Sequence, residues 1–450
     1  MFWVQNGFMK AFAITSLIIL FITSLAAGET TTHGVDTDSD NRNYPGFEIL
    51  IYENPHPANL FIHSMAQTRY MAILSPDLLP LWFINSESLG YDFKPNRNGK
   101  LTYFQRDELF WIMMDEKMIE IDTLACVNGY FADSHDIQVL PDGHYFLIAY
   151  DEQFIDMSEI VPGGHPNALV EGLIIQEFDG EYNLILEWKS WDHYEITDYV
   201  HGNLTSDEIR YVHGNAIDIT QDGNILLSSR SLDEVTKIDR TTGDIIWRFG
   251  GSQNQFTIIN DPLGGFYSQH DSRETDSGTI ILFDNGQYHD PHVSRIVEYE
   301  LNEETMEAEL IWSFTHPNEY FSASMGSVQR LENGNTLICW GNITPSPGSG
   351  AIITEVDPSG NIQLEIAYNE VYQSYRVRKS DWKFGIDLVR GNINLDGVID
   401  IFDIVETIDY IINGGEQDDV FHLYKCDLNF DHEIDLLDVT LLVNLILDGY

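Results

Sequence analysis

A short motif recurs along the middle of the chain: an apolar run, a tight turn that ends in glycine, and a second apolar run. It occurs at Phe93–Gly99, Val139–Gly143, Ile219–Gly223 and Leu331–Gly334, with a weaker copy at Ser277–Gly278. Asn-Gly and Asp-Gly supply the positive φ that a two-residue hairpin turn needs. Because little helical periodicity is seen between about residues 45 and 390, this region is predicted to be all-β.

A second pattern gives the architecture. A strand, a short turn and a strand that often ends in Trp are found six times, at 70–83, 118–131, 173–188, 235–249, 295–314 and 352–368. Two hairpins per copy make four strands, and four-stranded units at a regular period are typical of a β-propeller. The prediction is a six-bladed β-propeller over residues 45–390. The alternative, a pair of β-sandwiches, would not need so regular a repeat.

Composition excludes several classes of protein. The chain has 450 residues, and its 72 Asp and Glu against 23 Lys and Arg give a net charge of −49, which argues against nucleic-acid binding. The 55 aromatic residues (24 Phe, 22 Tyr and 9 Trp) exclude global disorder. Cys126, Cys339 and Cys426 are too few for a disulfide scaffold and are interpreted as small core hydrophobes. Whether Cys126 and Cys339 pair stays open.

The first residues predict export. Lys10 is the only charge before Glu29, and an apolar run from Ala11 to Leu25 is followed by small residues. This pattern is typical of a signal peptide over 1–26, cleaved after Ala26, so the expected location is secreted: periplasm, cell surface or medium. An uncleaved anchor is the alternative, although the run is short for a membrane span. Residues 27–44 read as a flexible acidic leader, and no membrane span is expected after cleavage.

Polar residues fall in register with the hairpin glycines. His135, Asn215 and His270 each lie eight residues before the turn glycine of their repeat. His213 shares the strand face of Asn215, and Arg230 lies across the hairpin from both. Equal offsets mean equal heights on successive blades, so these side chains are predicted to converge at one mouth of the central channel.

This cluster predicts an anion site. A single histidine at the start of a strand usually has a structural role, but three histidines together with an amide and an arginine indicate a functional site. An arginine that points into the channel of so acidic a chain is interpreted as a binding group for an anion. The cluster lacks the helix N-terminus of a nucleotide-phosphate site and the paired carboxylates of a glycoside hydrolase. A three-histidine zinc site remains an alternative, which the adjacent arginine disfavours.

Several segments together resemble the arylsulfotransferase family of secreted bacterial propellers, over roughly residues 50–385. They are Ser134–Gln138, Val212–Asp218, Ser228–Arg230, Lys237–Trp247, Gln269–Asp271, Phe283–Gly286 and Gly326–Arg330. The resemblance implies transfer of a sulfuryl group from a phenolic sulfate ester to a phenol acceptor, through a sulfated histidine and without a nucleotide sulfate donor. Ping-pong kinetics would follow from the two-step transfer.

The resemblance also implies a role for each member of the cluster. His270 matches the nucleophile, His213, Asn215 and Arg230 match the residues that hold the sulfate oxygens, and His135 matches the residue that handles the phenol proton. Ser324 and Ser327 are candidates for a further sulfate contact. The family's disulfide loop before the nucleophile has no counterpart here, because residues 251–268 lack Cys. A sulfate-ester hydrolase and a non-catalytic propeller that binds sulfated glycans remain alternatives.

Residues 391–450 change in character to acidic loops followed by apolar helices. Oxygen-bearing residues stand at positions 1, 3, 5, 9 and 12 of two loops that start 35 residues apart, a spacing typical of EF-hand calcium sites. The predicted Ca²⁺ ligands, with a backbone carbonyl at position 7, are Asn392, Asn394, Asp396, Val398, Asp400 and Asp403 in the first loop and Asp427, Asn429, Asp431, Glu433, Asp435 and Asp438 in the second.

The two loops resemble a type I dockerin, a small all-α EF-hand-like domain, which implies a cohesin-type module as partner. Positions 10 and 11 of the loops, Ile401 with Phe402 and Leu436 with Leu437, match the family's partner-contacting sites. Simple core packing would explain the same residues, and both interpretations stay open.

Overall fold

The structure, a computed structural model, describes residues 47–65, 69–78, 80–85, 89–343, 351–368, 373–385, 390–394, 398–413, 425–429 and 433–448. The predicted signal peptide over 1–26 and leader over 27–44 lie outside the described residues. In the described part of the chain, no helix combines the length and the apolar character needed to cross a membrane.

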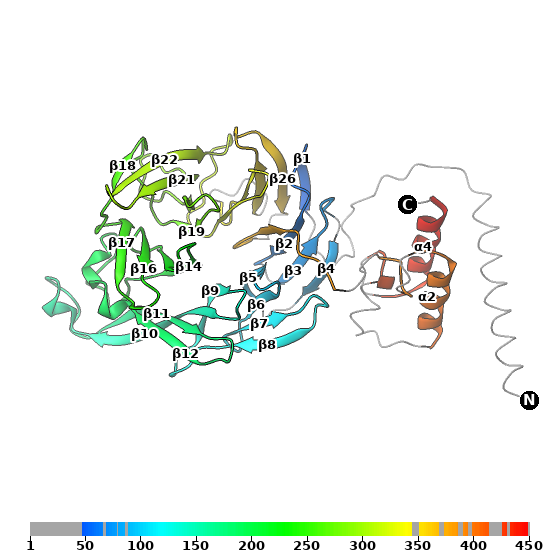
Figure 1. Cartoon of the computed structure of the whole chain (residues 1–450), viewed down its shortest axis with the longest axis horizontal. Coiled ribbons are helices and arrows are strands. Elements are labelled where there is room, and N and C mark those ends of the chain that lie inside the picture. Colours follow the sequence, from blue (N-terminus) through cyan, green and yellow to red (C-terminus); the bar gives the residue numbers. More distant parts are fainter. Residues whose placement is uncertain are drawn as a thin grey trace, which may run out of the picture. The chain divides into compact units, whose positions relative to one another are not determined.

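Six antiparallel sheets follow one another around a common axis, as Figure 1 shows. The predicted six-bladed propeller is therefore confirmed. The strands of each blade are ordered from the innermost outward. The first blade consists of β27 (Arg378–Ser380), β2 (Asn59–His63), β3 (Tyr70–Leu74) and β4 (Pro80–Asn85), and the second of β5 (Leu89–Pro95), β6 (Leu101–Gln105), β7 (Phe110–Met114) and β8 (Glu120–Leu124). The third consists of β9 (Ala132–Val139), β10 (Tyr145–Ile155), β11 (Ala168–Phe178) and β12 (Leu184–Lys189).

The other three blades have the same order. The fourth blade consists of β14 (Gly214–Ile219), β15 (Ile225–Ser229), β16 (Glu234–Ile238) and β17 (Ile245–Gly250), and the fifth of β19 (His270–Glu274), β20 (Ile280–Asp284), β21 (Arg295–Asn302) and β22 (Glu307–Phe314). The sixth consists of β23 (Ser327–Arg330), β24 (Thr336–Cys339), β25 (Ile352–Val356) and β26 (Ile362–Tyr368). Two short strands pair in parallel with outer strands: β13 (Glu208–Arg210) with β11 and β18 (Thr257–Ile259) with β22.

Both ends of the propeller sequence close the ring. The first strand, β1 (Phe47–Tyr52), adds a fifth strand to the outer edge of the sixth blade, where Phe47 pairs with Tyr368. The last strand, β27, becomes the innermost strand of the first blade, where Lys379 pairs with Leu60. Closure by backbone hydrogen bonds at two places leaves no open seam between first and last blades.

The hairpin glycines lie where the sequence predicts. Each forms the turn between the two innermost strands of a blade, with φ of +77° at Gly99, +89° at Gly143, +85° at Gly223, +82° at Gly278 and +86° at Gly334. The first blade has no such glycine because its innermost strand comes from the other end of the propeller.

One outer hairpin differs from its prediction. In the second blade the strands are Phe110–Met114 and Glu120–Leu124, whereas the sequence pattern placed the hairpin at 118–131. Met118 lies in the turn itself, at a φ of +63°. The apolar run before that turn forms the strand, so the prediction was displaced toward the C-terminus.

The recurring tryptophans join neighbouring blades. The indole N–H of Trp188 donates to the Gly243 carbonyl at 3.0 Å, and that of Trp312 donates to the Pro358 carbonyl at 3.1 Å. In both cases the acceptor lies in the outer turn of the following blade. Trp247 makes the equivalent bond to the Glu303 carboxylate at 2.9 Å. The repeat therefore encodes a bond between blades as well as core packing.

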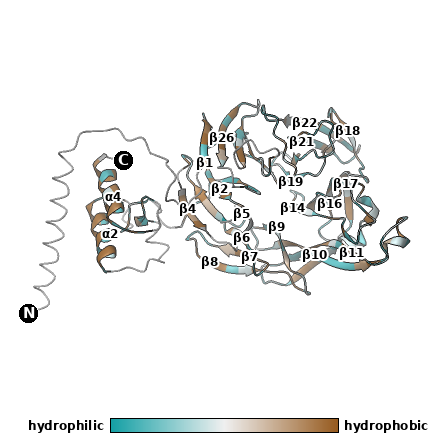
Figure 2. Ribbon diagram, turned by 180° about the vertical axis from the view of Figure 1, so that it is seen from behind, coloured by the Kyte–Doolittle hydropathy of each residue, from teal (hydrophilic) through white to brown (hydrophobic). Residues whose placement is uncertain are grey.

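The described residues of the C-terminal part include the helices α2 (Ile401–Asn413) and α4 (Leu436–Asp448). Their core includes Ile404, Val439, Leu442 and Cys426, all buried. Figure 2 shows apolar residues along much of both helices. Cys126, Cys339 and Cys426 are free thiols, and the last two are almost fully buried, as expected of small core residues.

Candidate active site

The five predicted site residues lie where the innermost strands of three consecutive blades begin. His135 is on β9, Asn215 on β14, and His270 is the first residue of β19. His213 immediately precedes β14, and Arg230 follows β15, where its backbone N–H donates to the His213 carbonyl at 2.8 Å. The equal offsets from the hairpin glycines therefore do correspond to one level of the channel.

Ring contacts show that the histidines meet. The rings of His135 and His213 are edge to face with centroids 4.7 Å apart. Tyr375, from the segment before β27, lies between two of them, 5.4 Å from His135 and 6.1 Å from His270. Asn215 is fully buried, and its amide Nδ2 donates to the Gln269 carbonyl at 2.6 Å, next to His270.

His270 is held in one tautomer. Its Nδ1 lies 2.7 Å from Asn285 Oδ1 and 3.1 Å from the Ser268 carbonyl, both acceptors, so Nδ1 carries the proton. Its Nε2 accepts the Met325 backbone N–H at 3.3 Å, so Nε2 carries the lone pair. Burial, with a further contribution from the charge of Arg230, lowers the pKa of His270 to about 3. The imidazole is therefore a neutral base at ordinary pH.

Arg230 places a cation without a carboxylate partner beside this imidazole. Its Nη2 donates to Gln287 Oε1 at 3.2 Å and weakly to the Ala323 carbonyl at 3.4 Å. Its Nε is buried without a hydrogen-bond acceptor, and no described carboxylate forms an ion pair with it. In a chain of net charge −49, an unpaired arginine of this kind is a natural anion site.

The other two histidines differ in environment. Burial, together with the nearby His135, His270 and Arg230, lowers the pKa of His213 well below its usual value, so this ring is neutral. The Nδ1 of His135 lies 2.5 Å from Asp133 Oδ1. This contact with the carboxylate fixes the orientation of the His135 ring.

Sequence reasoning missed two residues of the site. Tyr375 is buried, and its hydroxyl donates to the Asn215 carbonyl at 3.2 Å. Asn285, also buried, lies in the quoted segment Phe283–Gly286, but its own role was not recognised. The hydroxyl of Ser327, a candidate for a sulfate contact, accepts the Val377 backbone N–H at 3.1 Å. Ser324 accepts the amide of Asn342 at 3.1 Å.

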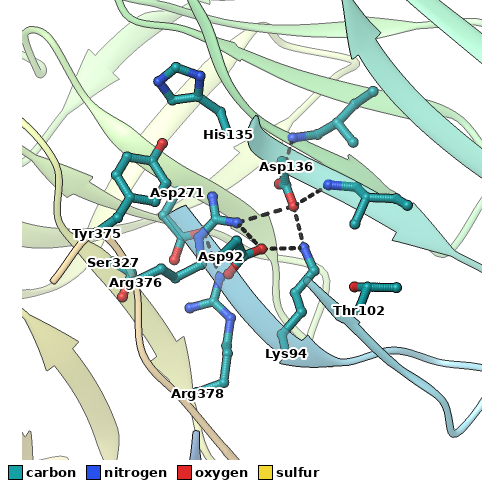
Figure 3. A network of polar contacts seen from close by, with 12 residues as sticks. Asp92, Lys94, Thr102, His135, Asp136, Asp271, Ser327, Tyr375, Arg376 and Arg378 are labelled. Carbon is teal, nitrogen blue, oxygen red and sulfur yellow. Dashed lines mark hydrogen bonds and ion pairs between the residues drawn. The ribbon is translucent and has the colours of Figure 1, made fainter. Parts of the chain in front are cut away.

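A buried ionic network lies beside the cluster (Figure 3). Its carboxylates include Asp136 and Asp271, the residues that directly follow His135 and His270. Arg376 lies 2.8 Å from Asp92, 3.1 Å from Asp136 and 3.2 Å from Asp271. The other cations of the network are Lys94, Arg273 and Arg378.

The network fixes the strands that bear the histidines. Burial opposes ionisation of Asp136, but Arg273, Arg376 and Lys94 hold the pKa of this carboxyl well below its usual range. The second oxygen of Asp136 accepts the Ile217 N–H of the next blade at 3.0 Å. Asp271 likewise accepts the Val328 N–H of its next blade at 2.9 Å. Each carboxylate thus holds a histidine-bearing strand in register with its neighbour.

A cavity of about 480 Å³ opens at the opposite mouth, among the hairpin turns. Its walls include Arg97, Arg273 and Arg330 but none of the five clustered residues. These cations are already paired, Arg97 with Asp218 at 2.8 Å, for example. This cavity is therefore separate from the histidine cluster.

The zinc alternative does not fit the geometry. His135, His213 and His270 all belong to the described residues, and among those residues no three His, Cys, Asp or Glu side chains are placed to share a metal ion. The histidines instead contact one another, Tyr375 and carboxylate or amide partners.

The two predicted calcium loops share one pattern of hydrogen bonds. Asp403 Oδ1 accepts the backbone N–H groups of Ile393 and Asn394, and its Oδ2 accepts that of Asp400. Asp438 makes the same bonds at the equivalent positions of the second loop, with Leu428, Asn429 and Asp435 as donors.

The described ligand set consists of carboxylate, amide and carbonyl oxygens, the atoms that Ca²⁺ prefers. Asn392, Val398, Asp427 and Glu433 are among the described residues, whereas Asp396 and Asp431 lie outside them. The side chains at loop positions 10 and 11 are exposed: Ile401 47%, Phe402 62%, Leu436 62% and Leu437 52%. Core packing therefore does not explain these four apolar residues.

Comparison with known proteins identifies a family for this chain. No curated protein matches the chain. Among solved structures, a Bacteroides caccae protein of unknown function is 13% identical, covering 72% of this chain and 99% of its own, with a TM-score of 0.46. Virginiamycin B lyase from Staphylococcus aureus is 9% identical, covering 72% and 89%, with a TM-score of 0.38. The model of the arylsulfotransferase (ASST) family matches residues 79–376, more than half of the chain and all five clustered residues. The chain therefore belongs to the arylsulfotransferase family.

Proposed function

We propose that this protein is an aryl-sulfate sulfotransferase that moves a sulfuryl group from a phenolic sulfate ester to a phenol by a ping-pong mechanism through sulfated His270. One observation carries the proposal. The unprotonated Nε2 of a neutral, tautomer-fixed imidazole lies next to an arginine that has no carboxylate partner. Attack on a sulfate ester requires a nucleophile and, beside it, a positively charged group that binds the sulfate oxygens.

In the first half-reaction the Nε2 lone pair of His270 attacks sulfur as the ester S–O bond breaks. The electron pair of that bond passes to the phenolic oxygen, which takes a proton from His135. Arg230, His213 and Asn215 donate to the sulfuryl oxygens as charge builds on them. In the second half-reaction an acceptor phenol returns its proton to His135, attacks sulfur, and releases His270.

The direct test is to expose the full chain briefly to an aryl sulfate, then to measure its mass and locate the modified residue. We expect an added SO₃ on His270 and release of one phenol per chain, followed by loss of the label when a phenol is supplied. His270→Ala should abolish both labelling and turnover. His165→Ala, an exposed histidine, is the matched control and should behave as wild type. Labelling that persists in His270→Ala would falsify the assignment.

Two other functions are distinguished by the same assay. A hydrolase would release phenol at a rate that does not respond to added acceptor. A non-catalytic propeller that binds sulfated glycans would bind its ligand tightly and never acquire SO₃. The transferase is favoured because the buried nucleophile is shielded from bulk water, which disfavours hydrolysis of the intermediate.

We also propose that residues 391–450 form a calcium-binding dockerin that attaches an exported enzyme to a cohesin-type module. The matching bonds of Asp403 and Asp438 and the exposed apolar pairs at positions 10 and 11 support this role. Pull-down of the full chain on a cohesin panel tests it, with and without a calcium chelator. Capture that is independent of calcium, or that survives Phe402→Glu combined with Leu437→Glu, contradicts it.

A further inference from the structure

Asn285 provides the shorter of two hydrogen bonds to His270 Nδ1; the other acceptor is the Ser268 carbonyl at 3.1 Å. Asn285 Oδ1 lies 2.7 Å from His270 Nδ1. The orientation of the amide is fixed, because Nδ2 donates to the Ser322 carbonyl at 2.8 Å and to the Met325 carbonyl at 2.9 Å. A flipped amide would place its oxygen against two carbonyl oxygens. Oδ1 therefore always faces the imidazole.

Met325 completes the arrangement around the ring. Its carbonyl holds the Asn285 amide while its N–H donates to His270 Nε2 at 3.3 Å. One residue therefore contacts both the positioning amide and the attacking nitrogen. The long distance to Nε2 is that of a weak hydrogen bond, which an incoming sulfur atom can replace.

The chemistry of an amide at this place differs from that of a carboxylate. Histidines that act as bases are often paired with an aspartate through Nδ1, whose negative charge stabilises the imidazolium that forms. An amide oxygen accepts the hydrogen bond but cannot take the proton. In the described structure the charged and titratable groups that face His270 include Arg230, His135, His213 and Tyr375. No carboxylate is among its hydrogen-bond partners.

We propose that Asn285 is a positioning residue that keeps the Nδ1 proton on His270 throughout the transfer cycle, so that the sulfated ring stays a cationic, readily cleaved donor. When Nε2 takes SO₃, the retained Nδ1 proton leaves one positive charge on the ring beside one negative charge on the sulfonate. The acceptor phenolate then forms its S–O bond, and the N–S electron pair returns to Nε2 of a neutral imidazole. If the Nδ1 proton were lost first, the leaving nitrogen would carry a full negative charge, and cleavage would be slow.

This inference rests on the proposed function, because it concerns how quickly sulfated His270 passes its SO₃ group to the acceptor. The first measurement uses the wild-type chain labelled with ¹⁵N-histidine, with His270 assigned from the signal missing in His270→Gln. We expect a protonated Nδ1 and an unprotonated Nε2 from pH 5 to 8. The opposite tautomer, or an equal mixture, overturns the inference, and this result does not require any Asn285 variant to fold.

The second measurement is the decay of the sulfated enzyme after rapid mixing with a phenol. Asn285→Ala should slow decay by about 10-fold to 100-fold, the effect of losing a hydrogen bond to a charged group. In Asn285→Asp the carboxylate still accepts from Nδ1 and stabilises the positive charge of the sulfated ring without taking its proton, so decay should stay closer to the wild-type rate than in Asn285→Ala. In Asn285→Ala, decay should slow further as the pH rises, because the sulfated ring then loses its Nδ1 proton more easily. Wild type should show no such pH dependence. Asn333→Asp makes the same change at another Asn-Gly pair, in an exposed hairpin turn, and should match wild type.

The outcomes separate the two proposals. If wild-type His270 never acquires SO₃, the proposed function fails. If it does, but both Asn285 variants transfer their label at the wild-type rate and with the wild-type pH dependence, the inference about Asn285 fails while the sulfotransferase stands.

Discussion

The imidazoles of His135 and His213 meet edge to face, with ring centroids 4.7 Å apart, although they start the innermost strands of two different blades. Asp133 anchors Nδ1 of the first ring at 2.5 Å. Burial keeps the second ring neutral by lowering its pKa. In the proposed mechanism the two histidines in contact would have separate tasks: His135 would transfer the phenol proton, and the neutral His213 would donate a hydrogen bond to the sulfuryl group.

The first prediction concerns proton transfer by His135. In His135→Gln we expect turnover of phenyl sulfate to fall by about 10²-fold to 10⁴-fold, the usual effect of losing a general acid. The loss should be much smaller for 4-nitrophenyl sulfate, because its phenolate leaves without protonation. The measurement is the slope of the logarithm of the rate against the pKa of the leaving phenol. An equal loss across all donors would mean that His135 only shapes the site.

The second prediction concerns the unpaired cation. Arg230→Gln should lower kcat/KM by about 10²-fold to 10³-fold, similar to the loss of one oxyanion donor. Arg230→Lys should restore little, because an ammonium group cannot reproduce the planar fork of donors. Arg210→Gln is the control. The side chain of Arg210 is exposed, with its Nε 3.7 Å from Glu171 Oε1, and its replacement should leave kcat/KM unchanged. Full activity in Arg230→Gln would contradict the proposed role of Arg230 in binding the sulfuryl oxygens.

Much of the fold could be predicted from local sequence. The Asp-Gly and Asn-Gly turns require a positive φ, and three of the recurring tryptophans, Trp188, Trp247 and Trp312, each bond the outer turn of the next blade. Both requirements act over a few residues and recur in each repeat, so they are visible as a periodic pattern in the sequence. The displaced hairpin near Met118 shows the limit, since an apolar residue in a turn is indistinguishable from the start of a strand.

The site could be predicted in part for the same reason. Residues in register with the turn glycines, such as His135 and His270, must lie at one height. Tyr375 and Arg376 have no such register, because they precede the strand that closes the ring and reach the centre only after closure. Asn285 was missed because its partner is set by the fold of two loops rather than by spacing.

The third prediction concerns the ionic network that those residues complete. Arg376→Met should destabilise the propeller by about 3–5 kcal/mol, because Asp92, Asp136 and Asp271 would remain buried with one cation fewer. Thermal unfolding of the full chain measures the effect. Arg97→Met is the control, since the side chain of Arg97 is 47% exposed and its loss should cost at most about 1 kcal/mol. Equal stability of the two variants would show that the network is dispensable.

The fourth prediction concerns calcium. Titration of the metal-free full chain with Ca²⁺ should give two binding events, and Asp403→Ala or Asp438→Ala should each remove one, because a position-12 carboxylate is lost from one loop. Asp409→Ala, an exposed position on α2, should keep both. Chelation should reduce the helical circular dichroism signal, since ligand repulsion then opposes folding. Two events that persist in both loop variants would exclude these loops.

The fifth prediction concerns stability in acid. His63 is buried, neither of its nitrogens has a hydrogen-bond partner in the described structure, and burial lowers its pKa to about 3. His270 is lowered to about 3 as well. Below pH 6.5 the unfolded chain binds protons that the folded chain does not, so the free energy of unfolding should fall as the pH drops from 6.5 toward 3. Each such histidine contributes about 1.4 kcal/mol per pH unit over that range.

His63→Met isolates one of these contributions. The substitution keeps the volume, removes an unpartnered polar ring from the core, and leaves the active site intact. We expect a higher melting temperature at pH 5 than wild type, and a pH slope of stability smaller by one proton between pH 6 and 4. His165→Met, at an exposed position, should change neither. A parallel downward shift of the whole curve in His63→Met would mean instead that the imidazole has a partner that stabilises the folded chain.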